Sequence, residues 1–275
     1  MKIATVVPNT KFGDNSESSN LADFEQHLDN AKKQGADLVV FPESYPDNWK
    51  PPEIKNLPEI FSSLAKKYEI HFVAGILEPS NSNTPTFFNT SVLIDDQGNE
   101  IGRYRRTTPN LDPWLYKGGG KWEYQWARGK DLPVFNSKFG KIGILICSEV
   151  YVPELSRHLA KSGAEIIVYP TGLTSAKSPL YETWQTLVWA RAIENLAISV
   201  ATSNSIGDGG LSMVCSPENV ILNTKEEGVH VCDVDLERIK LLRNSHDGFI
   251  SEGPEIPFKT KPGIFMDWIR TDLNY

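Results

Sequence analysis

The sequence is poor in several features that would place it in a class at once. It has three cysteines in 275 residues, too few for a disulfide framework, and it opens without the apolar run of a signal peptide. We therefore expect a reducing, cytoplasmic compartment. No stretch approaches the roughly 18 apolar residues that a membrane-spanning helix needs, so we expect no membrane partner.

Positive charge is also scarce. The chain has 28 Lys and Arg against 35 Asp and Glu, a net charge of −7. This balance argues against a surface for nucleic acid or anionic lipid. The sequence has no metal-ligand spacing, no phosphate-binding glycine loop and no dinucleotide fingerprint, so we expect no cofactor.

What the sequence does contain is an internal repeat. Residues 35–44 read GADLVVFPES, and residues 163–172 read GAEIIVYPTG. A helical pattern precedes each copy, and an apolar run precedes each helix, at residues 2–8 and 141–147. The order strand–helix–strand is the crossover unit of a parallel sheet. We predict an α/β fold with internal pseudo-two-fold symmetry.

Further elements follow each copy of the repeat. Residues 71–77 read as a strand, and residues 88–106 as a hairpin that turns at residues 96–99. Residues 181–196 predict a helix, with three more strands behind it. Residues 107–128 are irregular and aromatic, as functional loops often are. No linker divides the halves, so we expect one domain, 1–275, whose tail, residues 244–275, wraps the surface or a partner subunit.

The two copies of the repeat differ where their strands end. Glu43 falls opposite Thr171, and Cys147 falls opposite Pro8. Ligands of α/β sheets bind beyond the carboxyl ends of strands, so both residues are candidates for chemistry. A cysteine after a buried strand is more often a small hydrophobic residue, and a glutamate there often caps a helix. Position alone leaves both alternatives open.

Several motifs, in a fixed order, add to this pattern. They are VVFPES around Glu43, FNTSVLIDDQGNEIGRYRR, FGKIGILICSEVYVPEL around Cys147, LAKSGAEIIVYPTG, WARAIENLAISVATSN and GGLSMVCSPENVIL. With these motifs the chain resembles the nitrilase, or carbon–nitrogen hydrolase, superfamily over nearly its whole length. The resemblance implies an α-β-β-α sandwich, a Glu–Lys–Cys triad with a second glutamate, and a homodimer formed through helices, here residues 153–162 and 181–196.

Carried over residue by residue, the resemblance makes Glu43 the general base, Cys147 the nucleophile and Glu123 the second glutamate. The backbone N–H of Ser148 is then a donor to the oxyanion. The triad lysine falls on Arg106, a departure from the family pattern. A guanidinium holds negative charge but does not give up its proton, so it does not serve as an acid. The aromatic loop either lines the substrate pocket or packs the loop or a dimer surface; its members are Trp114, Tyr116 and Trp122.

The expected function is hydrolysis of a small, non-peptide amide through a Cys147 acyl-enzyme. Two alternatives stay open at this point. The acyl group passes to an acceptor other than water, or the chain is a silent homologue that binds a small molecule or a protein partner. Retention of both Glu43 and Cys147 disfavours the silent homologue, because a pocket relieved of catalysis need not keep a thiol and a base.

Overall fold

The computed structural model describes residues 1–13, 16–47, 49, 54, 56–80, 86–108 and 125–244. Within them the strands form two sheets. The seven-stranded sheet has the order β13-β1-β2-β3-β4-β5, with β6 paired to β4. Its strands are β1 (Lys2–Val7), β2 (Leu38–Val40), β3 (His71–Pro79), β4 (Thr86–Ile94), β5 (Glu100–Arg105), β6 (Gln125–Ala127) and β13 (Gly228–Asp233).

The six-stranded sheet has the order β12-β11-β10-β9-β8-β7. Its strands are β7 (Val134–Ser137), β8 (Gly140–Ile144), β9 (Ile166–Leu173), β10 (Ile198–Asn204), β11 (Ser212–Cys215) and β12 (Val220–Thr224). The sequence repeat is preserved in the register. In the parallel pair β1–β2, Ile3 lies opposite Leu38, and in β8–β9 the equivalent Ile142 lies opposite Ile166. The two halves therefore correspond residue for residue at the strands that lead to Glu43 and Cys147.

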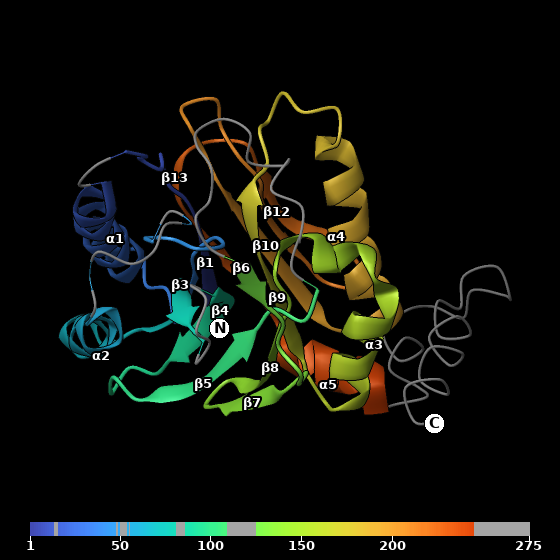
Figure 1. Ribbon diagram of the computed structural model, residues 1–275. Coiled ribbons are helices and arrows are strands. Elements are labelled where there is room, and N and C mark those ends of the chain that lie inside the picture. The colour runs from blue at the N-terminus through green and yellow to red at the C-terminus, as the bar shows by residue number, and fades with distance from the viewer. Residues whose placement is uncertain are drawn as a thin grey trace, which may run out of the picture.

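Helices cover the outer face of each sheet (Figure 1). Helices α1 (Ser16–Lys33) and α2 (Leu57–Tyr68) lie on one side, and α3 (Pro153–Lys161) and α4 (Tyr181–Asn195) lie on the other, with both sheets between them. Helix α5 (Leu236–Asn244) follows β13. The predicted α-β-β-α sandwich is confirmed.

The hydrophobic core covers both faces of the seven-stranded sheet, because one face packs on the other sheet and the opposite face packs on helices. Ile3 and Leu38 point into the cluster between the sheets, whereas their neighbours Ala4 and Val39 pack under α1 and α2. A strand buried on both sides reads as a continuous apolar run, and this is why residues 2–8 and 38–41 lack polar alternation. Phe24 of α1 stacks on Phe41, with ring centroids 3.9 Å apart, and fixes the helix to the sheet.

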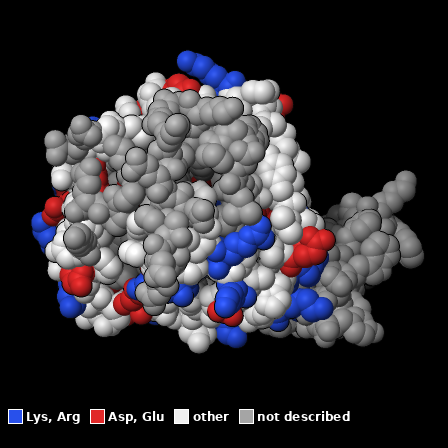
Figure 2. Space-filling view, in the orientation of Figure 1, with Lys and Arg blue, Asp and Glu red and all other residues white. Residues whose placement is uncertain are grey.

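The predicted hairpin is present as β4 and β5, closed by a turn in which the Asp95 carboxylate accepts the N–H groups of Gln97 and Asn99. The segment predicted to be irregular contains a short strand, β6, which pairs in parallel with β4. Apart from Asn244, which ends α5, the predicted tail lies outside the described residues. No helix of the described part is long and apolar enough to cross a membrane. Figure 2 shows acidic and basic side chains interspersed along the lower edge of the visible described surface.

Candidate active site

The ends of β2 and β8 meet at the centre of the molecule. Glu43 follows β2 and is fully buried, and Cys147 follows β8. The backbone N–H of Glu43 donates to the carbonyl oxygen of Thr171 at 3.2 Å. Thr171 is the residue that takes the place of Glu43 in the second copy of the repeat. The equivalent strand ends of the two halves thus face each other, and this places the carboxylate of one half beside the thiol of the other.

The two carboxylate oxygens of Glu43 have different surroundings. Oε1 accepts Nδ2 of Asn89 at 2.5 Å and Nη1 of Arg106 at 2.9 Å. Oε2 is buried and accepts no N–H or O–H donor of the described residues, and the Glu43 carboxylate interacts with the Cys147 thiol. A Cβ atom built on Gly172 would lie 2.8 Å from Oε2, so only glycine leaves this oxygen room. One oxygen is therefore held in place, and the other is free to exchange a proton.

Arg106 links Glu43 to the cysteine turn. It directly follows β5 and is 2% exposed. Its Nη1 binds Glu43, and its Nη2 donates to the hydroxyl of Ser148 at 2.6 Å. The planar guanidinium presents two donors in a fixed fork, so one side chain reaches both partners. The pair with Glu43 is fully desolvated, and loss of either partner leaves an uncompensated buried charge.

Cys147 begins a 3₁₀ helix, η2 (Cys147–Tyr151), and has a positive φ of 56°. A non-glycine residue in this region is uncommon, and such strain gathers at functional sites. Burial raises the pKa of the Cys147 thiol to about 12, and the Glu43 charge acts in the same direction, whereas Arg106 and the Gly172 N–H lower it. At neutral pH the resting site therefore holds a protonated thiol beside the Glu43 side chain.

Glu149 is a buried carboxylate that the sequence analysis did not single out. It is fully buried, and its oxygens accept the hydroxyl of Tyr104 at 2.8 Å and the N–H of Ile146 at 2.8 Å. They also accept the N–H and hydroxyl groups of Thr107 and Thr108 at 2.9–3.1 Å. Burial and the nearby Glu149 charge raise the pKa of Tyr104.

The structure brings together three of the predicted catalytic residues and Ser148. For Ser148 it shows a hydroxyl contact with Arg106; the predicted role of its N–H stays a prediction. The other predicted site residues lie outside the described residues: Glu123, Trp114, Tyr116 and Trp122. Asn89 and Gly172 were not predicted, because each meets Glu43 only through the tertiary fold. Among the described residues no group of His, Cys, Asp or Glu could hold a metal ion.

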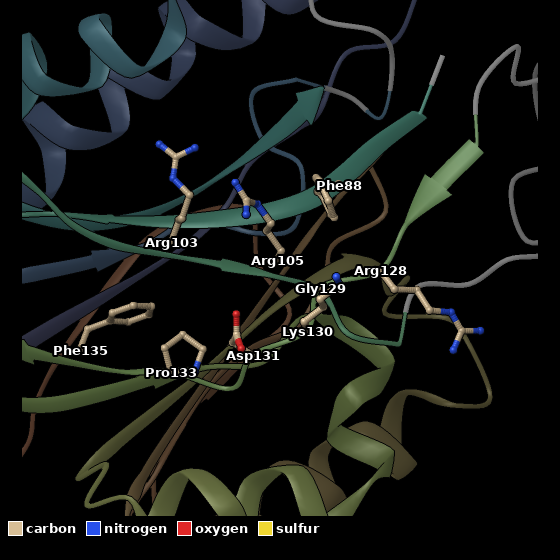
Figure 3. Close-up of a pocket in the computed structure, with 9 residues that line it drawn as sticks. All are labelled: Phe88, Arg103, Arg105, Arg128, Gly129, Lys130, Asp131, Pro133 and Phe135. Atoms are coloured by element: carbon tan, nitrogen blue, oxygen red, sulfur yellow. The ribbon is translucent and has the colours of Figure 1, made fainter. Parts of the chain in front are cut away.

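A separate cleft of about 570 Å³ lies on the other side of β5 (Figure 3). Side chains alternate along a strand, so Tyr104 and Arg106 point inward while Arg103 and Arg105 point to this cleft. Both arginines pair with Glu78, at 2.9 and 2.5 Å. The residues that line this cleft include neither Glu43 nor Cys147.

Comparison with known proteins shows the family of the chain. The model of the carbon–nitrogen hydrolase family matches residues 2–244. A deaminated glutathione amidase of Synechocystis sp. is 30% identical, covering 82% of this chain and 89% of that protein. An N-carbamoylputrescine amidase of Oryza sativa is 27% identical, covering 87% and 88%.

Solved structures show the same fold. An amidase from Nesterenkonia sp. superimposes with a TM-score of 0.72 at 21% identity, covering 87% of this chain and 92% of that one. A mutant of that amidase carries the acetamide moiety of fluoroacetamide covalently at its active site cysteine. The family match and the Synechocystis relative each span most of the chain. This chain belongs to the carbon–nitrogen hydrolase family.

Proposed function

We propose that the chain hydrolyses a small, non-peptide amide, with Cys147 as nucleophile, Glu43 as general base and Arg106 as the fixed cation. The observation that supports this most is the asymmetry of Glu43. Its Oε1 is bound by Arg106 and Asn89, while its Oε2 is buried and accepts no N–H or O–H donor of the described residues. The same carboxylate interacts with the Cys147 thiol. A base needs one free oxygen in a fixed place.

The first half of the reaction forms a thioester. Sγ of Cys147 attacks the amide carbonyl carbon as its proton passes to Oε2 of Glu43. Because burial holds the pKa of the thiol at about 12, this transfer accompanies the attack. The oxyanion is stabilised by the Arg106 guanidinium and the Ser148 N–H. The C–N bond then breaks, and Glu43 returns the proton to the leaving amine, since guanidinium does not release one.

The second half regenerates the thiol. Glu43 takes a proton from water, and the hydroxide attacks the thioester carbonyl. The C–S bond breaks, the acid product leaves, and Cys147 regains its proton from Glu43. In this proposal Glu123 is a second carboxylate near the leaving amine, and Trp114, Tyr116 and Trp122 contact the substrate.

The test is intact-protein mass spectrometry of Cys147 with a panel of small amides, read together with release of ammonia or amine. We expect a transient adduct that decays to free enzyme in water, absent in Cys147→Ser and present in Cys215→Ser, which removes a thiol from β11. An adduct that leaves only when an amine is added would assign acyl transfer instead. A panel that leaves no adduct, with the native fold intact, would refute the enzymatic proposal.

A further inference from the structure

Glu149 is a buried acidic side chain that has no cationic partner in the described part of the chain. Among the described residues no lysine, arginine or histidine forms a salt bridge with it, and its side chain is fully buried. Every contact is a donor, from Tyr104, Thr107, Thr108 and Ile146. An ionised carboxylate only accepts, so this set satisfies it completely. A buried charge in place of an apolar side chain costs stability, and this favours a role other than stability.

The donors come from two segments that carry the reacting groups. Tyr104, Thr107 and Thr108 enclose Arg106 on both sides along the chain. Ile146 immediately precedes Cys147, and Glu149 reaches back to its N–H as in a capping box. The same carboxylate therefore binds residues on both sides of Arg106 and the residue that precedes Cys147. The guanidinium fork of Arg106 faces Glu43 and Ser148.

We propose that Glu149 is a positioning residue that sets the distance of the Arg106 guanidinium from Cys147. Strand β5 ends at Arg105. Beyond it the Arg106 N–H donates to the carbonyl of Asn89, and its carbonyl accepts the N–H of Gly129. Glu149 adds a clamp on the two residues that follow, Thr107 and Thr108. The inference rests on the proposed function only in giving Arg106 a catalytic role, and the position itself is measurable without turnover.

The measurement is the rate of Cys147 alkylation by iodoacetamide at pH 9, followed peptide by peptide because Cys215 and Cys232 are also thiols. Glu149→Gln keeps the shape but places an NH₂ group against donors. If Arg106 moves away, the pKa of Cys147 rises, and we expect alkylation to slow about tenfold, the effect of one pKa unit on the thiolate fraction. Simple removal of a nearby negative charge would speed it instead. A faster or unchanged rate therefore overturns the proposal.

Two further variants make the result specific. Glu154→Gln removes an exposed carboxylate five residues further along the chain and is expected to leave the rate within about twofold. Tyr104→Phe keeps the ring and removes the donor that binds both Glu149 oxygens. It is expected to slow alkylation by about threefold, and it serves as the test if Glu149→Gln does not fold. If Glu149→Gln does not fold and Cys147 of Tyr104→Phe is alkylated at the native rate, the proposal that Glu149 positions Arg106 is refuted.

A double-mutant cycle tests whether Glu149 acts on Cys147 through Arg106. If Glu149 acts through Arg106, Glu149→Gln in an Arg106→Ala background changes the alkylation rate by less than about twofold. An equal loss of about tenfold in both backgrounds would show that Glu149 acts on Cys147 directly and would refute positioning through Arg106. With an amide that turns over, Glu149→Gln is expected to lower kcat about tenfold with KM within about threefold.

Discussion

The two halves of the molecule share a scaffold and divide the chemistry. Their parallel strands have the same register, yet one strand end carries Glu43 where the other has Thr171, and one carries Cys147 where the other has Pro8. The N–H of Glu43 binds the carbonyl of Thr171, so the equivalent loops touch across the pseudo-two-fold axis. Backbone symmetry thus allows one half to supply a carboxylate and the other a thiol.

Removal of the Glu43 carboxylate is expected to have the largest effect on activity. Glu43→Gln is expected to abolish turnover, because Gln accepts no proton from the thiol. The matched change in the other half, Thr171→Val, removes a hydroxyl that donates to the carbonyl of Tyr169 and is expected to keep most activity. The measurement is single-turnover acylation of the two variants. Comparable losses in both would mean that the loops matter as a structural pair and that Glu43 is not the base.

The pH dependence of Cys147 alkylation in Glu43→Gln separates two roles of Glu43, that of a base and that of a nearby charge. The Glu43 charge raises the pKa of Cys147, so the variant thiol has a lower pKa and more thiolate at about pH 9.5. Near pH 7 the loss of the base dominates. We expect iodoacetamide to alkylate the variant more slowly than the native protein near neutral pH and faster at the alkaline value. Faster alkylation at both values would leave Glu43 an electrostatic role alone.

Arg106 joins the halves, and loss of its charge is expected to have the next largest effect. Arg106→Ala is expected to lose about 2–4 kcal/mol of transition-state stabilisation, the scale of one oxyanion donor. It also leaves Glu43 buried without its cation. Arg106→Lys keeps the charge but loses the fork, so either Glu43 or Ser148 loses its bond, and we expect partial acylation. If native protein, Ala and Lys variants acylate at one rate, Arg106 has no part in the mechanism.

Gly172 and Ser44 are the next equivalent pair, and they test how closely the loops approach. Gly172→Ala places a Cβ atom 2.8 Å from Oε2 of Glu43. We expect a loss in kcat of about 10- to 100-fold with the fold retained, since a small displacement of a reacting group costs this much. Ser44→Ala removes a buried hydroxyl that has no partner among the described residues and is expected to be nearly silent. Full activity in Gly172→Ala would show that Oε2 is not the proton acceptor.

Much of this arrangement was predictable from the sequence. The repeat placed Glu43 and Cys147 at matched strand ends, and the hairpin placed Arg106 at the end of β5. Helix α2 went unpredicted although Leu57, Phe61 and Leu64 have helical spacing. The short strands β6, β7 and β12 gave too little periodicity to be assigned, and their pairing is set by neighbours in the sheet.

The supports of the site were not predictable in the same way. Asn89 binds Glu43 across 46 residues, and Tyr104 binds Glu149 across 45. Such polar contacts leave no local pattern, because each residue type is also common in strands and turns. Glu149 gave one signal, an acid two residues after Cys147, and only the fold shows that its donors surround Arg106.

The helix layers of the two halves differ as well, and this gives the smallest expected effect on activity. On the helix predicted for the dimer interface, residues 181–196, Trp184 and Val188 face the core of their own chain. Trp189 of α4 is 38% exposed, and Leu180 just before α4 is 55% exposed. The described residues of α1 and α2 expose no large apolar side chain. A homodimer through the α3–α4 face (Figure 1) therefore stays our prediction, now centred on Trp189.

Trp189→Arg places a charge in that face and is expected to shift the protein from dimer to monomer at micromolar concentration. Its activity is expected to stay within about twofold of the native value, because Glu43, Arg106 and Cys147 come from one chain. Val220→Arg, at an equally exposed apolar residue on β12, is the matched control and should leave the dimer intact. Light scattering of the three proteins decides the matter. A monomeric native protein would refute the dimer. A monomeric Trp189→Arg that has lost most of its activity would show instead that the site depends on the partner subunit, and that the two halves of one chain are not sufficient for catalysis.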